Sequence, residues 1–204
     1  MNIMNYILGL DSGKEKPQLS LTDFFERIIE DISVKMPEFS YIVNPHRILV
    51  CLARANNTRK SGVYAKIVPM NFPNGSPFKE FDGQLYSMPQ ILTPNGNIMY
   101  IIYIYLPRFF LQDFDKRLLT IIHELYHISD EFDGTIRMFG GKPHGNSRER
   151  FNRNLLPFAE RYASVADNEL MDILKSDYKD LQKKYTVTGR CMSIPKAIRL
   201  SRLF

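Results

Sequence analysis

The chain has 204 residues, of which 44% are hydrophobic and 24% are charged, the composition of an ordinary soluble globular domain with its own core. Its two cysteines, Cys51 and Cys191, lie far apart, which excludes a disulfide framework and a cysteine metal cluster and favours a reducing compartment. The net charge of +5 lies entirely in residues 171–204, where eight Lys and Arg outnumber three Asp.

This basic C-terminal part of the chain can attract nucleic acid, and we expect its last residues, 186–204, to form a basic tail. The alternative is a solvated helix face followed by a flexible end. The most apolar run, residues 99–111, is too short to cross a bilayer. Because the N-terminus also lacks the basic region of a signal peptide, we expect a cytoplasmic protein that does not enter a membrane.

The first predicted element in chain order is an amphipathic helix over residues 20–36, with apolar residues at helical spacing and Thr22 as its cap. Two short apolar runs follow, residues 46–55 and 62–70, and they predict the two strands of a hairpin. Residues 69–98 are rich in Pro, Gly and Asn, so we expect a long loop or irregular insert there.

The later predicted elements are a buried strand at 97–106 and helices at 114–132, 147–167 and 169–185. Pro157 should kink or divide the helix that contains it. This order predicts the α+β class, with a small, mainly antiparallel sheet packed on helices. We expect a single domain over residues 1–185.

The sequence "HELYH" within the predicted helix 114–132 carries two histidines one helical turn apart, His123 and His127. Side chains at this spacing share one face of a helix and can direct two imidazoles at one Zn²⁺. Glu124 is turned by about 100° along the helix, where it can take a proton from a zinc-activated water without binding the metal. The alternative is two surface imidazoles on an ordinary amphipathic helix.

A catalytic zinc needs a third protein ligand, and the sequence offers two candidates after the helix. His144 lies in a glycine-rich loop that can fold back over the helix, and we favour it. Glu149 is the other candidate, although its position after Asn146 also fits a capping box. Asp130 follows His123 by seven residues, so on a continuing helix it could fix the tautomer of a ligand imidazole. The alternative for Asp130 is an exposed acid near a helix end.

The segment from "ARANNTRKSGVYAKIVPM" to "FDKRLLTIIHELYHISDEFDGTIRMFGGKPHG" resembles a metallopeptidase domain family found in phage, archaeal and bacterial proteins. The resemblance covers roughly residues 48–162. The later "HG" and "F", which are His144, Gly145 and Phe151, are also similar to SprT-like zinc proteases. These resemblances imply a small zincin fold, His123, His127 and His144 as Zn²⁺ ligands, and Glu124 as the base.

The sequence therefore predicts a zinc-dependent peptidase that acts on polypeptides. Residues 98–106 or 63–69 could supply an edge strand that holds extended substrate. One alternative is a DNA-associated, SprT-like protease that is recruited through its basic residues 171–204. Another is a non-catalytic, zinc-stabilised binding module, for example a phage accessory protein, although an intact Glu124 argues against it.

Overall fold

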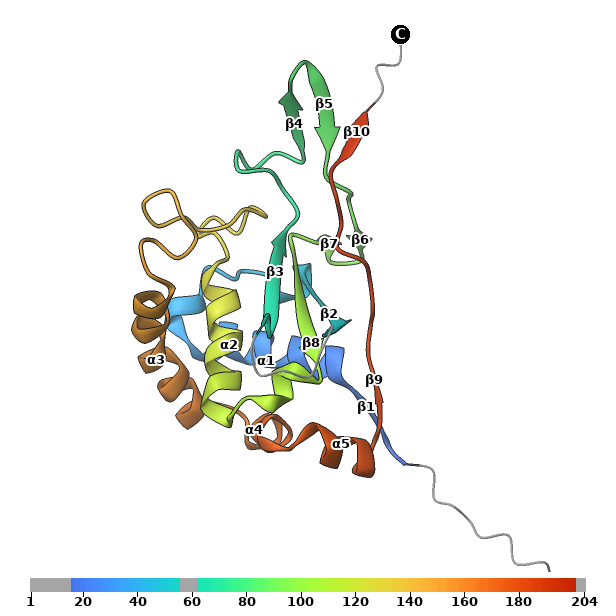
Figure 1. The fold of residues 1–204 in the computed structure, drawn as a ribbon, viewed down its shortest axis with the longest axis vertical. Coiled ribbons are helices and arrows are strands. Elements are labelled where there is room, and N and C mark those ends of the chain that lie inside the picture. The colour runs from blue at the N-terminus through green and yellow to red at the C-terminus, as the bar shows by residue number, and fades with distance from the viewer. Residues whose placement is uncertain (1–15, 56–61, 201–204) are drawn as a thin grey trace, which may run out of the picture.

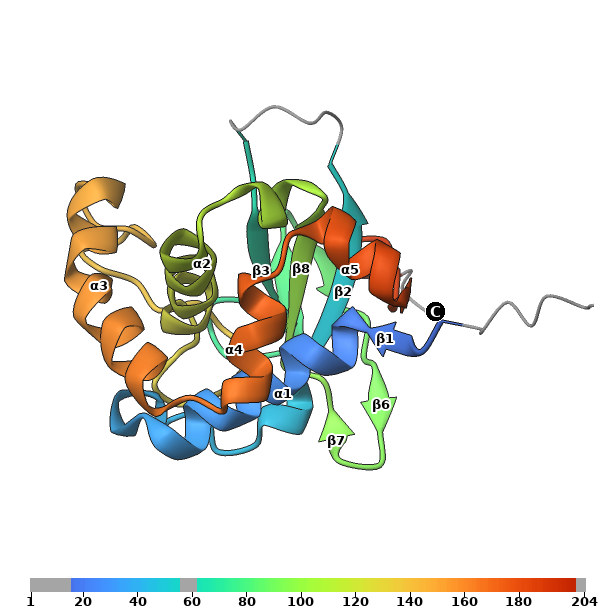
Figure 2. The ribbon, with the colours of Figure 1, turned by 90° about the horizontal axis from the view of Figure 1, so that it is seen from below.

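The computed structural model describes residues 16–55 and 62–200, and its centre is a three-stranded sheet that helices cover on one face (Figures 1 and 2). The strand order is β2 (Ile48–Arg54), β8 (Tyr100–Leu106) and β3 (Ala65–Pro69). The helices are α1 (Leu21–Lys35), α2 (Phe114–Tyr126), α3 (Arg148–Val165), α4 (Asn168–Lys175) and α5 (Tyr178–Lys184). The fold class is therefore mixed α+β, as the order of predicted elements indicated.

Helix α1 forms because its apolar residues recur on one face, and Phe24, Phe25 and Ile28 of that face are buried. The predicted cap was wrong. Ser20 caps the helix, since its hydroxyl accepts a hydrogen bond from the backbone N–H of Asp23 at 3.3 Å. Thr22 is instead buried in the first turn of the helix.

Strand β8 lies between β2 and β3, so the hairpin predicted from the two earlier runs is wrong. Strand β2 runs parallel to β8 with Ile48 opposite Tyr100, whereas β3 runs antiparallel to β8 with Ala65 opposite Ile104. The first five residues of β8 are all buried, which requires covering on both faces and favours the central place in a sheet. The sheet is consequently mixed rather than mainly antiparallel.

The two faces of this sheet pack against different parts of the chain. One face contributes Val50 and Ile102 to the large core formed with the helices. The opposite face contributes Cys51 and Tyr103 to a smaller cluster, where the Tyr103 hydroxyl donates to the carbonyl of Ser193 at 3.1 Å. The C-terminal segment is therefore packed on the back of the sheet.

The region predicted as a long loop contains a hairpin that projects from the body (Figure 1). Strands β4 (Phe78–Phe81) and β5 (Gln84–Ser87) are joined by Asp82 and Gly83, both with positive φ, as a two-residue hairpin turn requires. Strand β10 (Ile198–Leu200) adds to β5, which gives the order β10-β5-β4. We call these three strands the arm.

The remaining strands are short. They are β1 (Gln18–Ser20), β6 (Leu92–Thr93), β7 (Gly96–Asn97) and β9 (Thr186–Thr188). Strand β9 pairs in parallel with β1, so the segment after α5 joins two sheets in its described part. The domain boundary at residue 185 stays a prediction.

Two corrections concern the C-terminal helices. Helix α3 runs undivided past Pro157, so the predicted division is wrong, while the predicted kink stays a prediction. Its buried residues Leu155 and Ala159 lie on either side of the proline. The segment predicted as one helix at 169–185 is divided into α4 and α5 at Ser176 and Asp177.

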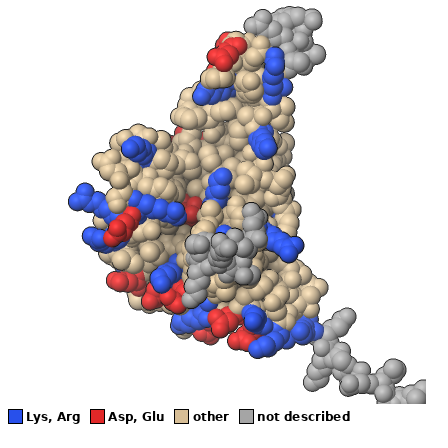
Figure 3. Space-filling model, viewed as in Figure 1, with Lys and Arg blue, Asp and Glu red and all other residues tan. Residues whose placement is uncertain are grey.

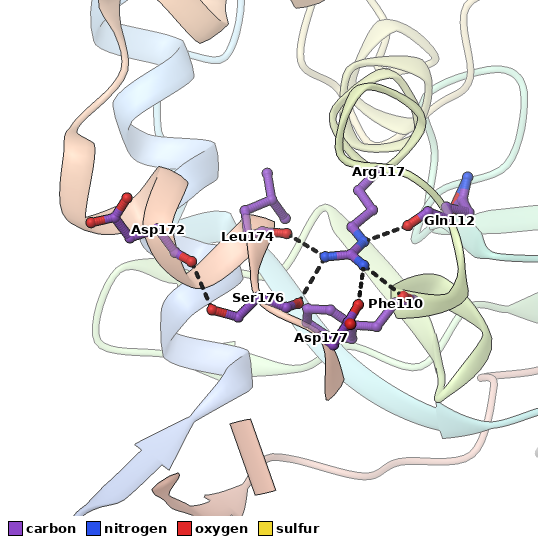
Figure 4. A network of polar contacts seen from close by, with 7 residues as sticks. All are labelled: Phe110, Gln112, Arg117, Asp172, Leu174, Ser176 and Asp177. Atoms are coloured by element: carbon purple, nitrogen blue, oxygen red, sulfur yellow. Dashed lines mark hydrogen bonds and ion pairs between the residues drawn. The ribbon is translucent and has the colours of Figure 1, made fainter. Parts of the chain in front are cut away.

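A buried arginine ties this break to the start of α2 (Figure 4). The Arg117 side chain is 4% exposed and forms an ion pair with Asp177 at 3.4 Å. Its guanidinium also donates, at 2.7 to 2.8 Å, to the backbone carbonyls of Phe110, Gln112, Leu174 and Ser176. Arg117 therefore supplies a hydrogen-bond donor to four backbone carbonyls of the two chain segments that it joins.

The basic residues of the C-terminal region do not form one patch in the described part of the chain. Lys175 and Lys183 lie on α4 and α5, whereas Arg199 lies on the arm, and the visible Lys and Arg are spread over both ends of the molecule (Figure 3). No helix within residues 16–55 and 62–200 has the length and hydropathy needed to span a bilayer. The expectation about the N-terminus concerns residues 1–15, outside the described part.

Candidate metal centre

The two motif histidines lie at the C-terminal end of α2, which is shorter than predicted. The helix ends at Tyr126, and His127 is its C-cap. Beyond it, Ile128 pairs with Ile136 in an isolated bridge, and this tertiary contact turns the chain away from the helix axis. Asp130 is therefore not on the helix. It is exposed and forms an ion pair with Arg137, so its predicted contact with an imidazole is wrong.

A glycine-rich loop carries His144 back to the end of α2. Phe139 and Lys142 pair across this loop, and Gly140 and Gly141 between them have φ of 61° and 81°. This left-handed conformation is readily accessible to glycine only, so the loop depends on these residues. His144 consequently lies beside His123 and His127.

The Nε2 atoms of the three imidazoles converge on one point. The distance is 3.1 Å between His123 and His127, and 3.0 Å from His144 to each of them. A neutral imidazole nitrogen has only one donor or acceptor direction, so three such atoms facing each other cannot all form well-aligned hydrogen bonds. Three lone pairs directed at one point instead suit a divalent cation, and no other group of three such side chains lies together in the described part.

Two other side chains that could bind a metal lie elsewhere. Glu149 follows the cap Ser147 of α3, and its side chain is 83% exposed and pairs with Arg153 at 3.0 Å. His46 is exposed in a short turn, Pro45–Arg47. Neither residue approaches the three imidazoles, so His144 rather than Glu149 completes the cluster.

Asn152 of α3 supports the cluster, and sequence reasoning did not find it. The Nδ1–H of His123 donates to Oδ1 of Asn152 at 2.6 Å, which leaves the lone pair of His123 on Nε2. Asn152 is 29 residues beyond His123. A polar residue directly after a buried aromatic residue on the following helix was the one available signal, and it is a weak one.

Phe151 packs against all three imidazoles. Its ring centroid lies 5.1 Å from those of His123 and His127 and 5.2 Å from that of His144. Tyr126 contacts Phe151 and stacks on Phe139, so it is a packing residue. This aromatic packing fixes the orientation of the three rings without using their nitrogen atoms.

Burial keeps the three imidazoles neutral. It lowers the pKa of His123 to about 4 and that of His127 to about 3, and it also lowers the pKa of His144. The Nδ1 atom of His127 is buried without a hydrogen-bond partner in the described part of the chain. Neutral imidazole is the form that binds metal, so the cluster is ready for a cation near pH 7.

Glu124 lies beside the cluster and is 7% exposed. Its Oε2 accepts a hydrogen bond from the backbone N–H of Ile67 on β3 at 2.8 Å. Burial raises the pKa of Glu124 to about 7, although the Ile67 N–H partly opposes this shift. A carboxyl group with this pKa can both accept and release a proton near neutral pH.

A comparison with protein families matches residues 18–153 to the family described as "Putative phage metallopeptidase". This match spans most of the chain, including α1, the sheet, the motif helix and Asn152. The chain belongs to this family. No curated protein and no solved structure matches it. The family match begins well before residue 48, so the family domain includes α1.

In this family member, a cleft of about 390 Å³ opens beside His123 and Glu124. His123, Glu124 and Asn152 line it on one side, and Tyr64 and Ala65 at the start of β3 line it on the other. A second cavity of about 360 Å³ is lined by His144, Phe151 and further aromatic residues. The cluster therefore borders this cleft through His123 and the second cavity through His144.

Proposed function

We propose that the protein is a zinc-dependent peptidase in which His123, His127 and His144 hold the metal and Glu124 is the general base. The observation that carries the proposal is the convergence of three neutral Nε2 atoms, within 3.1 Å of each other, next to a buried carboxyl group. The family membership supports the same activity. A structural zinc site usually has four protein ligands, so a group of three favours catalysis over a purely structural role.

A bound Zn²⁺ supplies Lewis acidity, which polarises a peptide carbonyl and makes water a better nucleophile. The protein contributes the proton transfers. Glu124 takes a proton from the attacking water and passes it to the leaving amine, for which a pKa of about 7 is well suited. The hydrogen bond from Ile67 orients its carboxyl group, and Asn152 keeps His123 in the tautomer with a free Nε2.

The substrate edge is the outer edge of β3. Strand β8 is central in the sheet, so the alternative at residues 98–106 is not available. Tyr105 donates to the carbonyl of Tyr64, and Met70 donates to that of Met99, each at 3.0 Å. The backbone N–H and carbonyl groups of even-numbered residues in β3 therefore point toward β8, and those of odd-numbered residues point away from it.

Two odd-numbered residues matter for substrate binding. The N–H of Ile67 is taken by Glu124, whereas Ala65 lines the cleft with its N–H and carbonyl directed outward. An extended polypeptide can pair with Ala65 and pass the metal centre, which is strand addition to a sheet edge.

Two variants test the proposal. We expect His144→Ala to lose bound zinc, because two imidazoles alone do not complete the site, whereas the exposed His46→Ala serves as the matched control and keeps it. We expect Glu124→Gln to keep the zinc and to cleave an unfolded polypeptide at least 100-fold more slowly than the native protein. Zinc content is measured by elemental analysis and cleavage by mass spectrometry. A zinc-loaded native protein that cleaves no member of a broad peptide library would contradict the proposal.

A further inference from the structure

The charges that line the cleft are unequal. Arg148 and Lys116 are its cations, and Glu124 is its one acid among the described lining residues. Lys116 is bound to Asp113 at 2.9 Å, outside the metal centre. Arg148 forms no ion pair within residues 16–55 and 62–200, and its side chain is exposed. The cleft therefore offers one guanidinium whose charge is not compensated.

Helix α3 brings this guanidinium to the reacting centre. Arg148 and Asn152 are four residues apart on α3, so they share one face, and Asn152 binds His123 at 2.6 Å. Arg148 also lines the same cleft as His123 and Glu124, so its guanidinium and these groups share one surface.

We propose that the cleft selects peptides that carry a carboxylate close to the scissile bond, and that Arg148 is the residue that determines this preference. The inference rests on the proposed function, because it concerns the same cleft. A peptide paired with Ala65 on the β3 wall runs opposite α3, where Arg148 can form a charge-assisted and bidentate contact with a carboxylate. Because the edge of β3 carries no acidic side chain, the positive charge of Arg148 also repels basic peptides.

A carboxylate in a peptide has two sources, an acidic side chain and the chain terminus. The chemistry that Arg148 recognises is the same in both cases. An acidic side chain would make the protein an endopeptidase with a preference for Asp or Glu, whereas the terminus would favour removal of C-terminal residues. The test below separates the two sources by blocking the ends of the peptide.

The experiment measures binding in the full-length Glu124→Gln protein with zinc, and again after treatment with a chelator. The probes are fluorescent eight-residue peptides with blocked ends, in which one Glu is moved through the positions and compared with Gln. A further peptide has no acidic side chain and a free C-terminus. Fluorescence anisotropy gives each dissociation constant, so the result does not require turnover.

We expect a Glu peptide to bind about tenfold more tightly than its Gln counterpart. Adding Arg148→Gln should remove this ratio, Arg148→Lys should keep part of it, and Arg148→Glu should favour peptides with Lys. Arg153→Gln, an exposed change on the same helix, should leave the ratio unchanged. If the free C-terminus alone provides the tighter binding, the terminus is the source of the carboxylate.

The preference is refuted if no carboxylate peptide binds more tightly than its neutral counterpart, or if the ratio survives in Arg148→Gln. Each ratio is taken within one variant, so a general loss of folded protein does not produce it. Cleavage of peptides without any carboxylate preference would overturn this inference and leave the proposed function intact. If the protein binds carboxylate peptides more tightly but the native protein cleaves none of them, this inference stands and the proposed function is contradicted.

Discussion

The candidate metal centre and the arm hold their side chains in different ways. His123 and His127 are 5% and 4% exposed, and Phe151 packs against them from a separate helix. In the arm, all four residues of β4 are exposed, and Phe81 is 59% exposed. The metal centre thus depends on tertiary packing, whereas the arm depends on a local turn and on pairing between short strands. Substitutions that disturb packing should therefore affect the body far more than the arm.

The largest expected effect on stability is at Arg117 in the body. Arg117→Met would leave the backbone carbonyls of Phe110, Leu174 and Ser176 without their buried donor. We expect the free energy of unfolding to fall by about 3 kcal/mol. Urea denaturation measures this change. The neighbouring Lys116→Met removes only an exposed ion pair and should cost less than about 1 kcal/mol. Equal stability of the two variants would argue against the role of Arg117.

The next effect concerns the support of the metal centre. Asn152→Ala removes the acceptor of the His123 Nδ1–H, so we expect zinc affinity to fall by about 10- to 100-fold while the fold is retained. Competition with a chelator measures the affinity. Asn154→Ala, an exposed change on the same helix, is the control. Unchanged affinity in Asn152→Ala would mean that aromatic packing alone orients the ring.

The third effect is a pH dependence at Glu124 in the metal-free protein. Because burial raises the pKa of Glu124 from 4.5 to about 7, the folded protein retains a proton that the unfolded chain has released. Its contribution to stability is full below pH 4.5 and is lost as the pH rises to about 7. Glu124→Gln lacks this loss, so its advantage in unfolding free energy should grow from near zero at pH 4.5 to about 3 kcal/mol at pH 8.

The buried histidines act in the opposite direction. Their pKa values are lowered, so their contribution is full above pH 6.5 and is lost as the pH falls toward 4. Both proteins share these histidines, and the difference between the two unfolding curves therefore isolates Glu124. Urea titrations at several pH values measure it, and a difference that does not change with pH would refute the shifted pKa.

The smallest effect is expected in the arm. Phe81→Ser changes a side chain that is 59% exposed, so we expect the unfolding free energy to change by less than about 0.5 kcal/mol and zinc affinity to stay the same. Thermal melts and zinc titrations test both. A large loss in Phe81→Ser would show that the arm supports the body.

Sequence reasoning succeeded where local patterns decide the structure. The spacing of apolar residues correctly predicted α1, β8 and the start of α2, and the glycines around His144 correctly indicated a loop that returns to the motif helix. The three predicted imidazoles lie together, while their role as ligands stays a prediction.

The misses have a common physical cause, which is that distant contacts override local patterns. Strand β8 separates β2 from β3 because its two buried faces need covering, and no pattern within the two earlier runs encodes this. Helix α2 ends at Tyr126 because Ile128 pairs with Ile136. Asn152 supports His123 only because α3 packs on α2, which a single sequence does not reveal.

The place where the arm leaves the sheet has an evolutionary consequence. Strand β3 ends at Pro69 directly opposite Tyr100, where β8 begins, so the chain departs and returns at neighbouring points. The entropic cost of closing a loop between two such points rises only slowly with the length of the loop. Genetic insertions and deletions in the exposed arm between these two residues should therefore be well tolerated, whereas Met70 and Ile98 at its base are buried. The segment can diversify among relatives, as an exchangeable module, while the sheet and the three imidazoles keep their positions.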